Sequence, residues 1–272
     1  MVQSSLFDML ACVDPPLKWA GGKRWLVQHL RRIWEPHAHR RMVEPFCGGL
    51  AVTLGLSPDR ALANDVNRHL INFYQQVQRG LCVELQMAND EQLYYQHRAR
   101  FNSLAVGGGI HTAEAAQLFW YLNRTCFNGL CRFNASGGFN VPFGKYSTIN
   151  YRRDFADCTD AFARCEFLAG DFSAVPLRPD DFVYADPPYD VDFTDYSAGG
   201  FDWRDQVRTA EWLARHPGPV VLSNQATDRI VALYTQLGFE LQFLNAPRRI
   251  ACTGDRKPAR EVLATRNIEV RR

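Results

Sequence analysis

The sequence predicts an α/β protein: a doubly wound, mostly parallel sheet into which a helical and hairpin domain is inserted. Three observations lead to this fold class. Short apolar runs that end in glycine or polar residues alternate with segments of helical periodicity. The alternation stops in the middle of the chain and then resumes, and no internal repeat points to a solenoid or a propeller. Sheets of this type bind ligands beyond the carboxyl ends of their strands.

The elements before the interruption follow from periodicity and from residues that start or stop helices. In order, we expect a helix over 23–34, strands over 42–44 and 61–63, and a helix over 66–78. Pro36 terminates the first helix, because a proline cannot continue it. Asn64-Asp65 is expected to cap the second helix. Because the strand over 42–44 enters a glycine turn before a further helix, we interpret the part of the chain that begins with this strand as a βαβα rhythm.

The interrupting stretch has helical periodicity first and turn residues afterwards. The pattern is helical over 84–125, broken by Gly107-Gly108-Gly109, and the Gly-, Asn- and Pro-rich stretch over 128–145 predicts a hairpin and loop. The rhythm then resumes with strands over 166–168, 182–185 and 220–222 and helices over 202–214 and 228–236. We expect a core formed by residues 1–72 and 155–272 and an inserted domain formed by residues 73–154.

Composition excludes several classes of protein. Hydrophobic residues make up 46% of the chain and charged residues 22%, which excludes a largely disordered or collagen-like protein. No apolar run approaches the roughly 18 residues of a spanning helix, and the start lacks a basic region with a cleavage signal, so we expect a cytoplasmic protein without membrane contact. The eight cysteines form no CxxC pair and no histidine lies at zinc-ligand spacing, so we expect reduced thiols and no metal.

Charge is distributed unevenly, and this is more informative than the net charge of +2. No acidic residue lies between Glu114 and Asp154, a stretch whose five basic residues are Arg124, Arg132, Lys145, Arg152 and Arg153. Such a stretch could follow the phosphates of a nucleic acid. Only four of the 31 basic residues in the chain are lysines. Arginine suits phosphate and guanine, but codon bias in a GC-rich genome explains this composition equally well.

The motif Asp186-Pro187-Pro188-Tyr189 directly follows an apolar strand. Two consecutive prolines fix two φ angles and remove two amide donors, so the loop is stiff. It presents a carboxylate, the Pro187 carbonyl and an aromatic face at the edge where this kind of sheet binds ligands. Two acceptors and a stacking platform suit an exocyclic amine on a flat ring. Taken alone, the motif could equally be a Pro-Pro turn after a strand.

A second motif, Glu44-Pro45-Phe46-Cys47-Gly48-Gly49, leads from a strand into a glycine turn. Glycines allow backbone amides to approach a ligand closely. Asp65 ends the next strand and is placed to accept hydrogen bonds from a ribose or an amino group, although it could be only a helix cap. Glu44 and Asp65 add negative charge, which suits a cationic ligand such as S-adenosylmethionine better than a phosphate. A GxGxxG motif is absent from the sequence, so a dinucleotide is not indicated.

Together these residues resemble the Dam-like DNA adenine-N6 methyltransferases over nearly the whole chain. The stretches over 16–23, 44–49 and 186–189 are similar, in this order, to the family's amino-terminal cofactor motif, glycine motif and catalytic motif. The stretches over 122–134 and 139–145 closely resemble the DNA-reading hairpin of the GATC-methylating members, and they coincide with the basic stretch. The segment over 251–263 is similar to the closing loop and strand of the family. The glycine motif departs from the pattern, because Gly48-Gly49-Leu50 replaces the Gly-x-Gly of many relatives.

The resemblance implies a Rossmann-like methyltransferase core and roles for individual residues. The cofactor residues that it implies, together with those of the glycine motif, are Trp19, Lys23, Glu44, Phe46, Gly48, Asp65, Asp171, Phe172 and Asp186. Asp186, Pro187, Pro188 and Tyr189 would be catalytic and would hold the target base. The DNA contacts would come from Arg124, Phe127, Asn128, Leu130, Arg132, Pro142 and Lys145. Among these, Arg132 would read a guanine, Leu130 and Pro142 would touch a thymine methyl group, and Phe127 would wedge into the base stack.

The predicted function is transfer of a methyl group from S-adenosylmethionine to a flipped adenine in double-stranded DNA, within GATC. Asp186 and the Pro187 carbonyl would direct the lone pair of the amine toward the methyl group, by direct displacement without a covalent enzyme intermediate. Rotating the adenine out of the duplex costs about a few kcal/mol. Two alternatives are a non-catalytic DNA-binding protein that retains a cofactor pocket and a methyltransferase acting on RNA or a protein amide. A monomer is expected in solution.

Overall fold

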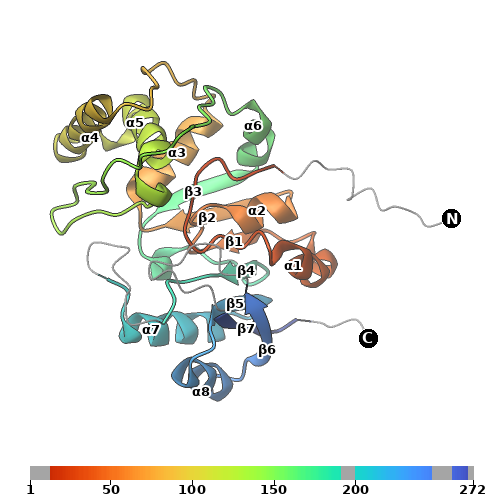
Figure 1. The fold of residues 1–272 in the computed structure, drawn as a ribbon. Coiled ribbons are helices and arrows are strands. Elements are labelled where there is room, and N and C mark those ends of the chain that lie inside the picture. The colour runs from red at the N-terminus through yellow and green to blue at the C-terminus, as the bar shows by residue number, and fades with distance from the viewer. Residues whose placement is uncertain (1–12, 191–199, 247–258, 269–272) are drawn as a thin grey trace.

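A seven-stranded sheet is the framework of the computed structural model, which describes residues 13–190, 200–246 and 259–268 (Figure 1). The strands are β1 (Met42–Glu44), β2 (Ala61–Asp65), β3 (Cys165–Ala169), β4 (Phe182–Ala185), β5 (Val220–Gln225), β6 (Glu240–Ala246) and β7 (Ala259–Arg266). Their order across the sheet is β3-β2-β1-β4-β5-β7-β6. Strands β1 to β5 pair in parallel, and β7 runs antiparallel to both of its neighbours. The predicted doubly wound, mostly parallel sheet is confirmed.

Helices cover both faces of this sheet. They are α1 (Val27–Trp34), α2 (Ala51–Leu56), α3 (Arg68–Gln78), α4 (Glu91–Val106), α5 (Ala113–Thr125), α6 (Ala156–Ala163), α7 (Trp203–Ala214) and α8 (Asp228–Gln236). Met42 of β1 packs in one apolar cluster with α1 and α2, whereas the next residue, Val43, packs in another cluster with α7 and α8. Successive strand residues point to opposite faces, so the central strands are apolar on both sides because helices cover both.

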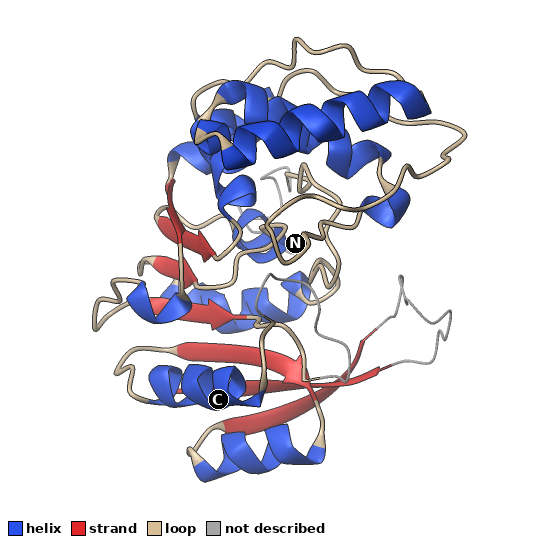
Figure 2. Ribbon diagram, turned by 90° about the vertical axis from the view of Figure 1, so that its left-hand side faces the viewer, coloured by secondary structure: helices blue, strands red, loops and turns tan. Residues whose placement is uncertain are grey.

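The inserted helices gather at the β3 end of the sheet (Figures 1 and 2). Helix α3 packs on β2 and β3 on one side and on α5 on the other. One continuous apolar cluster therefore includes Ala63 of β2, Phe73 of α3, Trp120 of α5 and Phe139 of the predicted hairpin. The predicted domain boundary between residues 72 and 73 lies inside α3.

The observed helices differ from the predicted ones mainly at their starts. Helix α1 begins at Val27 rather than at residue 23, after a turn in which the Leu26 amide donates to the Lys23 carbonyl. Asn67, and not Asn64 or Asp65, caps α3, because its side chain accepts from two amides of the first turn. Residues 84–90 lie outside any helix, and Asp90 caps α4.

The structure also differs from the prediction at α6 and in the stretch over 128–145. Helix α6 is a short helix of eight residues that the sequence interpretation missed. The stretch over 128–145 forms no strand, and only the isolated bridges between Cys126 and Phe143 and between Phe133 and Phe139 give it hairpin character. The closing loop over 251–257 lies outside the described residues.

The strand order places a crevice between β1 and β4. From β1 the chain continues to β2 on one side, whereas β4 lies on the other side and leads to β5. A sheet of this kind binds ligands where the order reverses, at the carboxyl ends of the strands. The glycine motif follows β1 and Asp186 follows β4, so both predicted motifs lie at this point. No helix in the described part of the chain is long and apolar enough to cross a membrane.

An ion pair fixes the opposite ends of the same two strands. Arg41, directly before β1, donates to both carboxylate oxygens of Asp181, directly before β4, at 2.9 and 2.7 Å. The Asp181 side chain is only 1% exposed, and Arg41 also donates to the Pro176 carbonyl at 2.9 Å. The hydrogen bond to Asp181 is the main reason that the pKa of Arg41 is raised. A charge enclosed in this way depends on its partner.

We expect Arg41→Ala to lower the free energy of unfolding by about 3 to 5 kcal/mol, because it leaves Asp181 buried and unpaired. Urea titration of the two proteins measures this difference. Arg100→Ala is the matched control, since it removes the arginine of an exposed pair with Glu114 and should change stability far less. Equal losses for the two variants would contradict a special role of the buried pair.

Candidate active site

A cavity of about 920 Å³ opens at the carboxyl ends of β1, β2 and β4. Its wall includes the glycine motif, Asp65, the loop over 186–189 and, from the inserted segment, Leu130 and Phe133. The described residues contain no group of three or more His, Cys, Asp or Glu side chains that could hold a metal ion. The predicted cofactor motifs and part of the predicted DNA-reading segment thus meet in one cavity.

Asp186 is held from two sides in this cavity. Lys23 Nζ lies 2.9 Å from Asp186 Oδ2, and Ser223 Oγ donates to Oδ1 at 2.8 Å. Lys23 is buried, donates to the Gly21 carbonyl at 2.8 Å and lies 4.6 Å from the centre of the Tyr189 ring. Each carboxylate oxygen therefore has a donor, and the lysine balances the charge. This arrangement suits a carboxylate in a mostly enclosed site.

Trp19 packs on the glycine motif, and this contact explains why glycine is required there. Gly48 has a φ of +43°, and a Cβ atom on it would lie 2.7 Å from Trp19 Nε1. A Cβ atom on Gly49 would lie 2.9 Å from Trp19 Cβ. The Gly48 carbonyl accepts from the Tyr74 hydroxyl at 2.6 Å. The turn is thus shaped by the tryptophan before it and by α3 behind it.

Asp65 holds the glycine motif rather than a helix end. Its Oδ2 accepts from the Gly48 amide at 3.1 Å, and its Oδ1 accepts from the Asn67 amide at 2.9 Å. The alternative that Asp65 is the helix cap is wrong, because Asn67 has that role. Burial raises the pKa of Asp65, and the two amide donors oppose the shift.

Glu44 is buried in the cavity wall, and its surroundings favour the neutral form of its carboxyl group. Its side chain accepts from the hydroxyl and, at 3.3 Å, from the amide of Thr53 in α2. Burial raises the pKa of Glu44 to about 8, against these two hydrogen bonds. Burial therefore works against the negative charge that the sequence predicts for Glu44 in this wall.

Three aromatic side chains line the cavity, namely Phe46 after β1, Phe172 after β3 and Phe201 before α7. The ring of Phe46 lies 5.2 Å from Phe172 and 5.8 Å from Phe201. The Arg208 guanidinium lies 4.4 Å from the Phe172 ring and donates to both oxygens of Asp171, at 3.0 and 2.8 Å. These hydrogen bonds hold the pKa of Asp171 at about 2. The sequence interpretation missed Phe201 and Arg208, which come from a segment without a recognised motif.

Residues of the predicted DNA-reading segment differ in their exposure to solvent. Phe127 is half exposed, Pro142 is exposed, and the Phe127 amide donates to the Pro142 carbonyl at 2.9 Å. Leu130 lies in the cavity wall. Arg132 is exposed, and its Nε donates to Asn140 Oδ1 at 2.9 Å, so this contact uses one of the five N–H donors of the guanidinium.

Of the remaining predicted DNA contacts, Arg124 lies next to the amino-terminal motif. Arg124 is half-buried against the Trp120 ring at 4.8 Å, and burial lowers its pKa. Lys18 donates to the Arg124 carbonyl at 3.4 Å and lies 4.0 Å from the centre of the Tyr146 ring. Asn128 and Lys145 are exposed and have positive φ angles of 53° and 36°.

The described cysteines are free thiols. Among the described cysteines none forms a disulfide, and Cys47, Cys126, Cys158 and Cys165 are buried. Burial raises the pKa of the Cys131 thiol, at the cavity wall, to about 12. These thiols therefore pack as small apolar groups.

Comparison with known proteins points to one family. Residues 19–248 match the family model of D12 class N6 adenine-specific DNA methyltransferases. The chain is 37% identical over 265 residues to a DNA N-6-adenine-methyltransferase of Escherichia phage P1, covering 90% of this chain but 34% of that protein. It is 34% identical over 263 residues to the retron Ec67 DNA adenine methylase of Escherichia coli, covering 91% and 90%. It is 32% identical over 254 residues to the type II methyltransferase M1.LlaDCHI of Lactococcus lactis subsp. cremoris, covering 86% and 88%.

We expect Glu44→Gln to change how stability depends on pH. The pKa of Glu44 is about 8 in the folded protein, against 4.5 for an exposed glutamate. Because folding raises this pKa, the carboxyl stabilises the fold below about pH 4.5, and this contribution is lost as the pH rises through 8. The stability of the wild type relative to Glu44→Gln should therefore fall by roughly a few kcal/mol between pH 5 and pH 8.

Urea titrations of both proteins at several pH values measure this difference. Glu114→Gln is the control, since its exposed carboxyl has a lowered pKa and is ionised throughout this range. Its stability relative to the wild type should stay constant. A constant difference for Glu44→Gln as well would show that Glu44 is ionised in the folded protein.

Proposed function

The chain belongs to the D12 class of N6 adenine-specific DNA methyltransferases, and we propose that it transfers a methyl group from S-adenosylmethionine to adenine N6 within GATC in duplex DNA. The observation that carries this proposal is the placement of Asp186, which is mostly enclosed, held by Lys23 and Ser223, and followed by two prolines and an aromatic ring. A carboxylate and a carbonyl next to a flat ring match the two hydrogens and the ring of an exocyclic base amine.

The residues of the cavity fit S-adenosylmethionine, which supplies an electrophilic methyl group when bound. The aromatic slot of Phe46, Phe172 and Phe201 suits the flat adenine ring. Trp19, Lys23, Asp65 and Asp186 also line the cavity. The carboxyl groups there, Glu44 included once a cation favours its ionised form, suit the positive charges of the ligand. We propose these residues, with Gly48 and Asp171, as its binding site.

The chain's own groups would prepare the target amine for transfer. The nitrogen lone pair is delocalised into the ring, so the site must redirect it rather than supply a strong base. Asp186 and the Pro187 carbonyl would accept the two amine hydrogens, and Tyr189 would stack on the ring. As positive charge develops on the nitrogen, the Asp186 carboxylate stabilises it and accepts or relays its proton.

Such a site accepts a base only outside the duplex, so we propose that the adenine is flipped. The segment over 73–154 would act as the DNA-recognition domain, while residues 1–72 and 155–272 carry the reaction. Phe127 is half exposed, as a residue that wedges into the base stack must be. Contacts to the DNA backbone, which support the base contacts, would come from Arg124, Asn128 and Lys145. A thymine methyl group would be contacted by Leu130 and Pro142.

GATC as the target rests on the hairpin residues. The chain is similar both to DNA adenine methylases and to type II methyltransferases. Membership of the family therefore does not identify the target sequence, and the proposal of GATC depends on the hairpin residues. Arg132 is the candidate reader of a guanine, because Asn140 orients its guanidinium and the side chain is exposed. An arginine held in this way can donate two parallel hydrogen bonds to guanine.

We expect the wild type to methylate unmethylated plasmid DNA at GATC and Asp186→Ala to abolish this activity while keeping the fold. Digestion with restriction enzymes that differ only in methyl sensitivity at GATC reads out the modification, and circular dichroism checks the fold. Methylation by Asp186→Ala at near wild-type rates would refute the catalytic role. N6-methyladenine outside GATC would refute the target and leave the activity intact.

We expect Arg132→Ala to relax discrimination at one guanine by about 1 to 3 kcal/mol, since it removes a bidentate base contact. Methylation rates on duplexes that differ at this single base measure the change. Arg153→Ala, in the same basic stretch but bound to the Val83 carbonyl, serves as the control. An equal loss on every duplex would instead assign Arg132 to a phosphate.

A further inference from the structure

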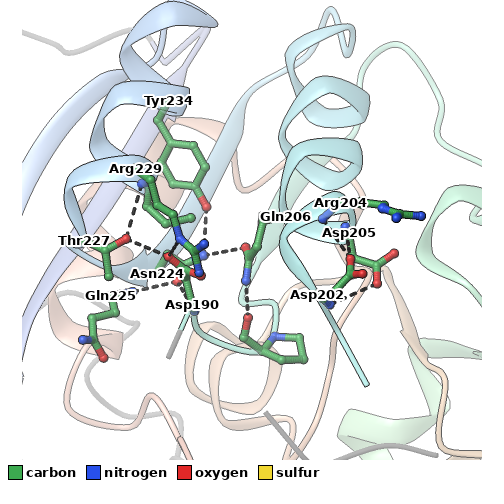
Figure 3. A network of polar contacts seen from close by, with 12 residues as sticks. Asp190, Asp202, Arg204, Asp205, Gln206, Asn224, Gln225, Thr227, Arg229 and Tyr234 are labelled. Atoms are coloured by element: carbon green, nitrogen blue, oxygen red, sulfur yellow. Dashed lines mark hydrogen bonds and ion pairs between the residues drawn. The ribbon is translucent and has the colours of Figure 1, made fainter. Parts of the chain in front are cut away.

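Two consecutive residues at the carboxyl end of β5 reach the loop that carries Asp186 from opposite faces of the sheet. Ser223 and Asn224 are 1% and 0% exposed. Neighbouring strand residues point to opposite sides. Ser223 Oγ lies 3.1 Å from the Tyr184 hydroxyl and donates to Asp186 Oδ1, at the front of the loop. Asn224 contacts the same loop from the other face of the sheet, which α7 and α8 cover, through hydrogen bonds with Asp190 and Gln206 (Figure 3).

The hydrogen bonds of Asn224 fix which way its amide group faces. Its Oδ1 accepts from the Asp190 amide at 3.2 Å and from the Gln225 amide at 2.8 Å. Its Nδ2 donates to Gln206 Oε1 at 2.9 Å and lies 3.1 Å from the Tyr234 hydroxyl. Because the oxygen meets two donors and the nitrogen meets acceptors, a reversed amide would lose several of these bonds at once.

Gln206 of α7 passes this orientation on to the loop. It is 2% exposed, and its Nε2 donates to the Pro188 carbonyl at 2.7 Å (Figure 3). Neither Pro187 nor Pro188 has a backbone N–H, so the carbonyl oxygens are the only backbone polar groups by which the protein can hold this part of the loop. The Gln206 contact therefore sets the plane of the peptide that follows Pro188.

At the far end of the loop, the Asp190 side chain makes further contacts in addition to the bond between its amide and Asn224. Its carboxylate accepts from Thr227 Oγ1 at 2.8 Å and from Arg229 Nε at 2.6 Å, and its side chain is 4% exposed. Thus Asp186, Pro188 and Asp190 are each held by hydrogen bonds from residues outside the loop. Asn224 contributes to two of these anchors, directly at Asp190 and through Gln206 at Pro188.

We propose that Gln206 and Asn224, together with Ser223, are positioning residues that set the Asp186 carboxylate and the Pro187 carbonyl relative to each other for methyl transfer. This inference rests on the proposed function. None of the three touches the reacting atoms in this assignment. They act by holding two acceptors that must face one amine, and a misplacement of about 1 Å in such a site costs about 100-fold in rate.

The test exploits the direction of the Gln206 amide. In Gln206→Glu, a protonated carboxyl can still donate to the Pro188 carbonyl and accept from Asn224, whereas the ionised form places an acceptor against that carbonyl. Burial raises the pKa of such a carboxyl, so protonation falls in a measurable range. At pH 8.5 we expect the kcat of Gln206→Glu to be lower than that of the wild type by about tenfold or more. The kcat of the variant divided by that of the wild type should rise as the pH falls to 6.

Single-turnover formation of N6-methyladenine in unmethylated plasmid DNA measures the rate, and calorimetric titration with S-adenosylmethionine measures cofactor affinity, which should change little. Gln236→Glu is the matched control, because it adds the same charge at an exposed position at the end of α8. Its rate relative to the wild type should be constant across this pH range. Gln206→Met removes the donor at every pH and should lower kcat by a constant factor, with circular dichroism confirming the fold.

A wild-type kcat for folded Gln206→Met would overturn the proposal, whatever Gln206→Glu does. An equal, pH-independent loss for both Gln206 variants, accompanied by weaker cofactor binding, would also overturn it, because it would indicate general damage to the cavity. Failure of the wild type to form N6-methyladenine would refute the proposed function instead. If the wild type forms N6-methyladenine and Asp186→Ala does not, the proposed function holds, and any failure then concerns the positioning residues alone.

Discussion

A mostly enclosed carboxylate needs a partner, and Lys23 meets this need for Asp186. The two residues are far apart in the sequence, so their ion pair requires the amino-terminal motif to fold back over the carboxyl ends of β1 and β4. The same motif places Trp19 on the glycine turn and Lys18 beside α5. This ion pair is accompanied by a single cavity whose wall includes the glycine motif, the loop over 186–189 and part of the inserted segment.

The carboxyl groups around this cavity have different environments and therefore different protonation. Asp171 is partly exposed and bound by Arg208, which keeps it ionised. Glu44 is buried with only a hydroxyl and an amide as donors, so its neutral form is favoured. A count of acidic residues cannot give the charge of a ligand site, because burial and partners decide which of them are ionised.

The sequence predicted those parts of the site that depend on local order along the chain. Asp186, Lys23, Asp65 and the hairpin residues are recognisable because each follows a strand or lies in a contiguous motif. Ser223, Asn224 and Gln206 were not predicted, because their roles depend on which strand lies beside β4. Polar residues at the end of the apolar run over 220–222 were an available signal for the first two. Helix starts were misplaced for a related reason: the Asn67 cap and the side-chain roles of Asp65 and Lys23 became apparent only in three dimensions.

Helix α3 belongs to both parts of the molecule, and this has a consequence for exchanging target preference between relatives. Its buried residues Phe73, Tyr74 and Val77 pack in the cluster that includes β2 and α5, and Tyr74 also reaches the glycine turn. A graft that begins within α3 would put foreign side chains against the sheet and against the glycine turn in the cavity wall. Chimeras should therefore keep α3 with its own sheet and join the new sequence after Gly80, where the chain is exposed and has left the helix.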